Sequence, residues 1–214
     1  MRKASDLNRK AHTDSLRVEL ERKSSHLVVL IFPVSLHCLH LKLGLIQLVL
    51  LISVITILFI ELYRIRINKN FFINRFTRDK EKTEIAVYLY NTTIWFLIFL
   101  SANYYDFAIA ELAILSTHLG DGAAAIIGKS VGKYRLILTK HKTWEGFFAG
   151  VIVTLFTGGI FLLTIGYMDK LWWVIIPGCV VGILDFFEGL PTWAGDNILN
   201  PLVSLAILLT LESF

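Results

Sequence analysis

The sequence predicts an all-α protein, a polytopic transmembrane helical bundle of about seven spans with a cytosolic N-terminus. Hydrophobic residues make up 55% of the 214 residues and charged residues only 18%. The mean hydropathy of +0.64 is far too high for a soluble domain of this length. Apolar runs recur along the chain at close to the roughly 20 residues that a helix needs to cross hydrocarbon. Lys and Arg, in contrast, gather in three separate segments.

Each apolar run is interpreted as a helix, because a backbone exposed to lipid must satisfy its own hydrogen bonds. We expect spans over residues 26–41, 43–62, 85–102, 106–127, 147–166, 171–187 and 197–212. The first contains Pro33, the sixth reaches Asp185 early and the seventh contains Pro201, so five or six spans remain an alternative. Cys38 and Cys179 both lie in apolar runs, which argues against a disulfide framework. No cleaved signal peptide is expected.

The basic residues predict the orientation. Of 21 Lys and Arg residues, seven precede residue 24, seven lie between residues 64 and 82, and five lie between 129 and 142. With seven spans these groups face one side, and only Lys42 and Lys170 face the other. The positive-inside rule then places the N-terminus in the cytosol and the C-terminus on the far side.

This orientation defines two predicted regions. Residues 1–25 form a basic cytosolic N-terminal segment, and residues 26–214 form a single integral membrane catalytic domain with a cytosolic nucleotide loop at 120–146. The net charge of +4 reflects the basic face, which could attract anionic lipid headgroups and a nucleotide. Nucleic-acid binding is not expected, and the oligomeric state is not predicted.

The segment 117–146 is the most informative part of the chain. An uncompensated carboxylate such as Asp121 at the centre of a span costs roughly 2.5–3.5 kcal/mol, so it needs a cation or an exit to water. Basic residues follow it at Lys129, Lys133, Arg135, Lys140 and Lys142. Glycines at 120, 122, 128 and 132 let a ligand approach the backbone. A polyphosphate with Mg²⁺ would satisfy both signs of charge.

This segment has two alternative interpretations. An ordinary cytosolic loop would have lysines that follow the topology and glycines that pack helices. A P-loop is mimicked by Gly122–Ser130, but five residues separate its glycines where the motif has four. A Walker ATPase is therefore not expected.

Polar residues in two further segments are predicted to reach the same membrane face. Before the first span these polar residues stand at helical spacing. A functional site and a solvated helix start explain that spacing equally well. Those residues are Glu19, Arg22, Lys23 and His26. Before the last span they surround a turn, and their oxygen donors suit a metal. Those residues are Glu188, Asp196 and Asn197, and helix capping by Asp196 or Asn197 is the alternative.

Some polar and small residues are assigned to packing. Glu111 and His118 share a helix face and are expected to join helices; lining the alcohol pocket is the alternative. His37 is expected at the membrane interface. Gly146 and Gly150 form a small-xxx-small pair, which predicts close helix packing.

These motifs together carry a family resemblance. The stretch GDGAAAIIGKSVGKYRLILTKHKTWEG, with ELERKSSH before it and EGLPTWAGDNILNP after it, resembles the CTP-dependent polyprenol kinase family. That family includes dolichol kinase, phytol kinase and CTP-dependent diacylglycerol kinase, and the resemblance runs from residue 19 to about 212. It implies a multi-pass membrane enzyme that transfers the terminal phosphoryl group of CTP, with a divalent cation, to a lipid alcohol at the cytosolic face.

The resemblance also implies roles for residues of the three motifs. The predicted catalytic residues are Asp121, Lys142, Glu188 and Asp196, with Asp121 and Asp196 as ligands of Mg²⁺. The predicted nucleotide-binding residues are Gly120, Gly122, Gly128, Gly132, Lys133, Lys140, Thr143, Glu145, Gly146, Asn197, Arg22, Lys23 and His26. As general base, Glu188 or Asp196 is favoured over His26. Gly195 stands where the family often has a second acid, so the number of metal ions is not predicted.

The main alternative is CDP-diacylglycerol synthase (phosphatidate cytidylyltransferase), because residues 142–146, KTWEG, are also similar to its signature. The N-terminal motif and the pair Asp196-Asn197 favour the kinase. A transporter is less favoured, since the acids gather at one face and not at the midplane. An assembly factor would leave the clustered lysines and glycines unexplained. CTP as donor follows from the resemblance alone, and the lipid is not predicted.

Overall fold

The computed structural model describes residues 16, 20, 21, 23–67, 87–137, 139, 142–184 and 196–213. In order, the helices are η1 (Ser25–Leu30), α2 (Ile31–Pro33), η2 (Val34–Cys38), α3 (Leu43–Arg66), α4 (Val87–Ser101), α5 (Phe107–Ser130), α6 (Trp144–Thr164), η5 (Met168–Val174), α7 (Ile175–Leu184) and α8 (Asp196–Glu212). Because η1, α2 and η2 are continuous, as are η5 and α7, the described residues form seven helical segments that coincide with the seven predicted runs. The all-α prediction is confirmed.

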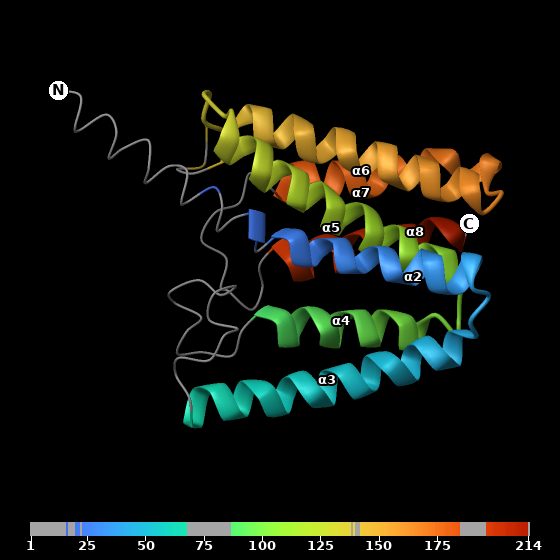
Figure 1. Cartoon of the computed structure of the whole chain (residues 1–214). Coiled ribbons are helices and arrows are strands. Elements are labelled where there is room, and N and C mark those ends of the chain that lie inside the picture. The colour runs from blue at the N-terminus through green and yellow to red at the C-terminus, as the bar shows by residue number, and fades with distance from the viewer. Residues whose placement is uncertain are drawn as a thin grey trace.

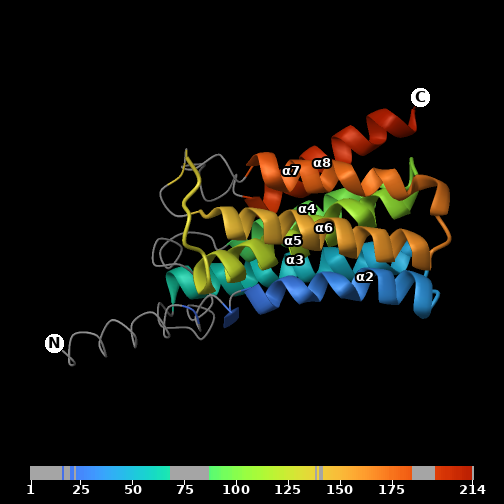
Figure 2. The same cartoon turned by 90° about the horizontal axis from the view of Figure 1, so that it is seen from above.

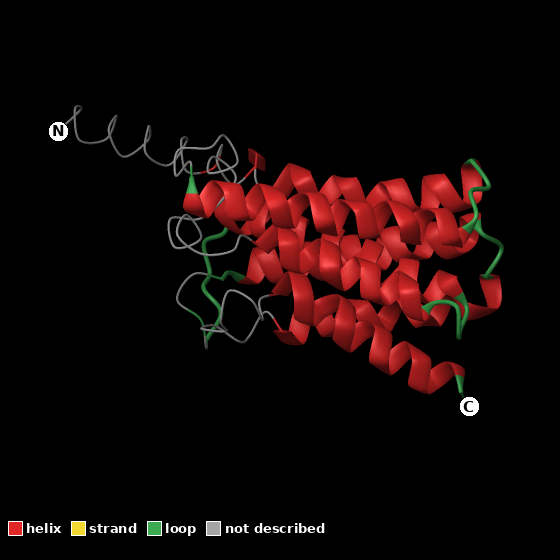
Figure 3. Cartoon of the chain, turned by 90° about the horizontal axis from the view of Figure 1, so that it is seen from below, coloured by secondary structure: helices red, strands yellow, loops and turns green. Residues whose placement is uncertain are grey.

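The helical segments lie side by side along one axis (Figures 1 and 2). One end of the bundle is where α3, α5 and α7 finish and α4, α6 and α8 begin; we call it the Asp121 end. The other, the far end, carries the connections at 39–42, 102–106 and 165–167 and the end of α8 (Figure 3). Lys42 and Lys170 lie at the far end, whereas Arg66 and Lys129 lie at the Asp121 end. The described basic residues therefore separate between the ends as their sequence positions predicted.

Within the described part of the chain, two helices, α3 and α6, are long and apolar enough to cross a membrane. In α3 only 11% of the most apolar stretch is buried, whereas the core helix of a soluble protein is mostly buried. Such an exposed apolar surface is typical of contact with lipid or with a partner protein. The number of spans and their orientation stay predictions.

The first helical segment is irregular around Pro33, which lacks an N–H and crowds the preceding turn. A 3-10 helix precedes Pro33 and a π-helical turn follows it, with the Leu39 N–H donating to the Val34 carbonyl at 3.0 Å. The segment ends before His40, whose φ is 51°. It nevertheless runs along α5, because Lys23, just before it, contacts Asp121, and His37, near its end, contacts Glu111.

The central helix is α5, which packs against α6, α7, α8, α4 and η1. Its contact with α6 depends on small residues: a Cβ added to Gly150 would lie 3.0 Å from the Ala124 Cβ and 3.2 Å from the Gly120 carbonyl oxygen. The predicted close packing at Gly146 and Gly150 is confirmed. Nearly all of α5 up to Gly122 is buried, so this helix holds Asp121 rigidly inside the bundle.

Candidate active site

Asp121 and Lys23 form a buried ion pair at the Asp121 end. Asp121 lies on α5 and is 9% exposed, and Lys23 lies just before η1 and is 5% exposed. The Lys23 Nζ donates a hydrogen bond to Asp121 Oδ2. A buried carboxylate needs a cation close to it. Lys23 is the cation that the apolar surroundings of Asp121 led us to expect. It brings together the N-terminal motif and the glycine-rich motif.

The chain between α5 and α6 folds back on itself. Arg135 and Thr143 form an isolated antiparallel bridge. Beside it, the Leu136 N–H donates to the Lys142 carbonyl at 3.0 Å, and the Trp144 N–H donates to the Tyr134 carbonyl at 2.8 Å. The predicted loop at 120–146 therefore consists of the last turns of α5, a short hairpin and the first turn of α6.

Thr143 and Glu145 fix this hairpin to the start of α6. Thr143 is the N-cap, and its Oγ1 accepts the Gly146 N–H at 3.2 Å. The Glu145 carboxylate accepts the backbone N–H groups of Lys133 at 3.0 Å and Tyr134 at 3.3 Å. Two amides that could have met a phosphate are thus bound by Glu145. Thr143 and Glu145 are both predicted to bind nucleotide. In this structure they position the loop that carries Lys133.

The glycines of the motif divide into two kinds. A Cβ on Gly132 would lie 2.2 Å from the Gly128 carbonyl oxygen, and one on Gly146 would lie 2.7 Å from the Ala124 carbonyl oxygen. These positions are explained by close packing. Gly122 is different, because no described atom beyond its own helical neighbours lies within 4 Å of the place of its Cβ. Close packing among the described residues therefore does not explain this glycine.

Several predicted residues cannot be placed. Arg22, Lys140 and Glu188 lie outside the described residues, as do the side chains of His26, Asp196 and Asn197. The backbone of Asp196 begins α8 at the Asp121 end of the bundle (Figure 1). Lys142 is half-buried in the hairpin at the same end.

The donor set at this end can be compared with what Mg²⁺ requires. Among the described side chains, no group of three or more His, Cys, Asp or Glu gathers as a metal cage. Mg²⁺ on a nucleotide is commonly held by one or two carboxylates, with phosphate and water oxygens completing the shell. A single carboxylate on Asp121 fits a metal that arrives with a triphosphate.

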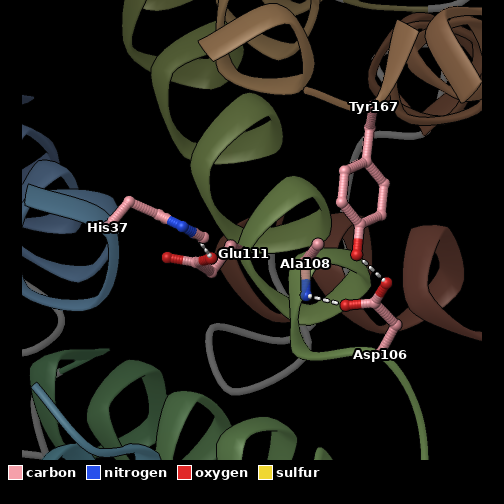
Figure 4. Close-up of polar contacts among 5 residues, drawn as sticks. All are labelled: His37, Asp106, Ala108, Glu111 and Tyr167. Carbon is pink, nitrogen blue, oxygen red and sulfur yellow. Dashed lines mark hydrogen bonds and ion pairs between the residues drawn. The ribbon is translucent and has the colours of Figure 1, made fainter. Parts of the chain in front are cut away.

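Polar contacts at the far end hold α5 to its neighbours (Figure 4). His37 Nε2 lies 2.7 Å from Glu111 Oε2. Asp106 caps α5 by accepting the Ala108 N–H at 3.0 Å, and it accepts the Tyr167 hydroxyl at 2.5 Å. Because the phenol donates to this carboxylate, the pKa of Tyr167 rises to about 12. Asp106 thus joins the start of α5 to the chain that follows α6.

Glu111 and His118 join helices, as predicted. Glu111 contacts His37 of η2, and His118 Nε2 accepts the Trp95 Nε1–H of α4 at 3.2 Å. Sequence reasoning missed Asp106, Tyr167 and Trp95. An aspartate just before an apolar run is an N-cap signal that could have identified Asp106.

Comparison with known proteins agrees with these motifs. A sequence model described as the cytidylyltransferase family matches residues 9–192. The chain is similar to dolichol kinase EVAN of Arabidopsis thaliana, with 28% identity over an alignment of 145 residues that covers 64% of this chain and 25% of that protein. The chain thus spans about a quarter of the length of the curated relative that it matches. No solved structure matches it.

Proposed function

Because the chain belongs to the cytidylyltransferase family, we propose that it is a membrane-embedded, CTP-dependent lipid-alcohol kinase. Its acceptor would be a polyprenol, a phytol-like alcohol or diacylglycerol. The similarity to a dolichol kinase supports a kinase. The observation that carries the proposal is the contact between Lys23 and Asp121. It joins the N-terminal motif, which favours the kinase over the synthase, to the glycine-rich stretch, of which residues 142–146 resemble both enzymes.

The proposed reaction moves one phosphoryl group. A bond forms between the alcohol oxygen and the γ-phosphorus of CTP, and the bond from that phosphorus to the β–γ bridging oxygen breaks. CDP leaves with the electron pair, and the hydroxyl proton passes to a base or to water. Phosphoryl transfer of this kind depends on positioning and on neutralising phosphate charge.

The residues at the Asp121 end can supply both the positioning and the neutralisation of phosphate charge. Asp121 would hold the Mg²⁺ of the nucleotide, and this cation neutralises phosphate charge when it is bound. Lys23, Lys133 and Lys142 are cations at the same end of the bundle and would contact the triphosphate. Glu145 holds the hairpin that presents Lys133 and Lys142. Glu188 or Asp196 would act as general base.

The proposed enzyme is a multi-pass integral membrane protein with its active site on the cytosolic face. Residues 1–25 would form the basic N-terminal segment, and residues 26–214 the catalytic domain. The basic residues at the Asp121 end and the exposed apolar surface of α3 support this arrangement. The alcohol would arrive from the bilayer, with its hydroxyl at the depth of Asp121.

CDP-diacylglycerol synthase is the second candidate, favoured by the family description and by residues 142–146. In that reaction the phosphate of phosphatidate attacks the α-phosphorus of CTP, and pyrophosphate leaves. The two reactions place different phosphorus atoms of CTP on the lipid, so labelled CTP separates them.

The experiment incubates the purified chain in detergent with Mg²⁺, CTP labelled at the α- or γ-phosphorus, and separate lipids. The lipids are phytol, dolichol, geranylgeraniol, diacylglycerol and phosphatidate. The kinase predicts γ-label on an alcohol, and an at least 100-fold loss in Asp121→Asn. Asp106→Asn, which changes an acid at the far end, is the matched control and should retain transfer. Alpha-label on lipid with release of pyrophosphate would establish the synthase instead.

A further inference from the structure

Three polar side chains inside the bundle have atoms without a hydrogen-bond partner among the described residues. The atoms are Oδ1 of Asn91 on α4, and Oδ1 of Asn200 and Oγ of Ser204 on α8. The three residues are 8%, 2% and 0% exposed. We call these side chains the polar seam. Buried polar atoms are nearly always paired, so three unpaired ones in one part of a core need an explanation. A fourth such atom, Oε1 of Glu111, belongs to the far-end contact with His37.

The contact between Trp95 and His118 sets the register of α4 against α5. The two helices run in opposite directions, and this hydrogen bond of 3.2 Å aligns them. Asn91 lies one helical turn from Trp95 toward the Asp121 end, and Gly122 lies one turn from His118 in the same direction. Asn91 and Gly122 are therefore level, on the faces of the two helices that meet. The depth of Asn91 in the bundle is thus that of Asp121.

Asn200 and Ser204 are four residues apart and share the buried face of α8. α8 packs against α5 and α4, and it begins at the Asp121 end. Asn200 therefore lies about one turn, and Ser204 about two turns, inside the bundle from the start of α8. The seam follows the meeting line of α4, α5 and α8 toward Asp121. Gly122 lies at the end of this line, and no described atom beyond its own helical neighbours lies within 4 Å of the place of its Cβ.

The unpaired atoms determine which chemical groups of a ligand can form hydrogen bonds with them. Two are carbonyl oxygens that accept hydrogen bonds and one is a hydroxyl oxygen, and all three side chains are neutral. Phosphate and ester oxygens are acceptors, so they cannot pair with a carbonyl oxygen. An alcohol hydroxyl can donate to it. A lipid alcohol in hydrocarbon also lacks water, so its hydroxyl needs a protein partner there.

We infer that the polar seam binds the hydroxyl group of the acceptor alcohol and directs it toward Asp121. This inference rests on the proposed kinase and assigns its acceptor subsite. Asn91 is the member level with Asp121, and Ser204 lies one helical turn deeper in the bundle than Asn200. A neutral seam fits an alcohol and not the anionic phosphatidate that the synthase would use.

Binding can be tested apart from transfer by measuring the melting temperature of the purified full chain in detergent. The probes are geranylgeraniol, a short-chain diacylglycerol, and for each the analogue that lacks the hydroxyl. Wild type should be stabilised more by one of the alcohols than by its analogue. Asn91→Leu and Asn200→Leu, which are close in volume to the natural residue, should lose this difference, and Ser204→Ala should reduce it. Equal stabilisation of wild type by alcohol and analogue would overturn the inference.

Controls are available on the same two helices. The Thr93 hydroxyl donates to the Leu89 carbonyl at 2.7 Å, and the Thr210 hydroxyl donates to the Ala206 carbonyl at 2.8 Å, so neither has an unmet bond. Thr93→Val and Thr210→Val should keep the hydroxyl-dependent stabilisation. The leucine variants should fold without ligand, since each removes an unpaired polar atom from the core.

Kinetics complete the test. Asn91→Leu or Asn200→Leu should raise the KM for the alcohol about tenfold, the effect of one lost hydrogen bond, and leave the KM for CTP unchanged. An unchanged KM for alcohol, or a raised KM for CTP, would contradict the subsite. If wild type transfers no phosphate but is stabilised by an alcohol through the polar seam, the proposed kinase activity is wrong and the alcohol site is supported.

Discussion

Lys23 and Asp121 are 98 residues apart in the sequence, yet the Lys23 Nζ donates a hydrogen bond to the Asp121 carboxylate inside the bundle. The contact fixes the start of the first helical segment against α5. It also gives a buried carboxylate the cation that it needs without substrate. A Mg²⁺-nucleotide would present both a cation for Asp121 and phosphate for Lys23.

We expect Lys23→Met to destabilise the chain by about 3–5 kcal/mol, because it removes the charge that faces a buried carboxylate. Adding Asp121→Asn should recover part of that loss, because the buried charge is then also removed. Unfolding of the two single variants and the double variant in detergent measures the coupling. Simple addition of the two single effects would contradict an ion pair that stabilises the fold.

Gly146→Ala should lower stability by about 1–3 kcal/mol, because the new Cβ would lie 2.7 Å from the Ala124 carbonyl oxygen and would push α5 and α6 apart. Gly159→Ala on the same helix is the control, since no described atom lies within 4 Å of its Cβ position. It should be neutral, or stabilising by up to about 1 kcal/mol. The measurement is thermal unfolding without nucleotide. Equal effects of the two substitutions would show that Gly146 has no packing role.

Glu145→Ala should speed hydrogen exchange at the backbone amides of Lys133 and Tyr134 by about tenfold or more, because both donate to this carboxylate. Glu145→Gln keeps one acceptor oxygen and should have a smaller effect. Asp169→Ala, at an exposed acid of the far end, serves as control. Unchanged exchange at both amides in Glu145→Ala would show that this carboxylate does not hold the hairpin.

Tyr167→Phe tests the far-end contact through pH. In wild type the pKa of Tyr167 rises from the ordinary 10.0 to about 12, because the phenol donates to the Asp106 carboxylate. A raised folded-state pKa contributes stability that is fully present below pH 10 and is lost as the pH rises through about 12. Wild type should therefore melt roughly 2–4 °C above the variant at pH 7, for a bond worth about 1 kcal/mol. The gap should close between pH 10 and 12, and a constant gap would refute the contact.

Much of the fold could be predicted because apolar runs mark helices. The run predicted at 106–127 is Phe107–Ser130 in the structure, and that at 43–62 is Leu43–Arg66. Both helices extend past the apolar run through Lys or Arg residues, which are good helix formers. The irregular turns around Pro33 depend on packing that no periodicity encodes.

The site was less predictable. Charge distribution predicted that Lys23 and Asp121 share one end, but it carries no information on which helices are neighbours. Nothing in the sequence marks Asn91, which Thr92 and Thr93 follow, or Asn200 as a core residue, and only the packing of α4 and α8 shows that both are buried. The contacts of Glu145 arise from closure of the hairpin, which spacing alone does not specify.

The most direct test of the nucleotide site is the melting temperature of the purified chain with and without Mg²⁺ and CTP. Wild type should be stabilised, by about 2.7 kcal/mol when the nucleotide is at 100 times its Kd. Asp121→Asn should show no stabilisation by the same mixture, whereas Asp106→Asn should respond as wild type does. If Asp121→Asn is stabilised as much as wild type, Asp121 is not part of a Mg²⁺-CTP site and the account is wrong.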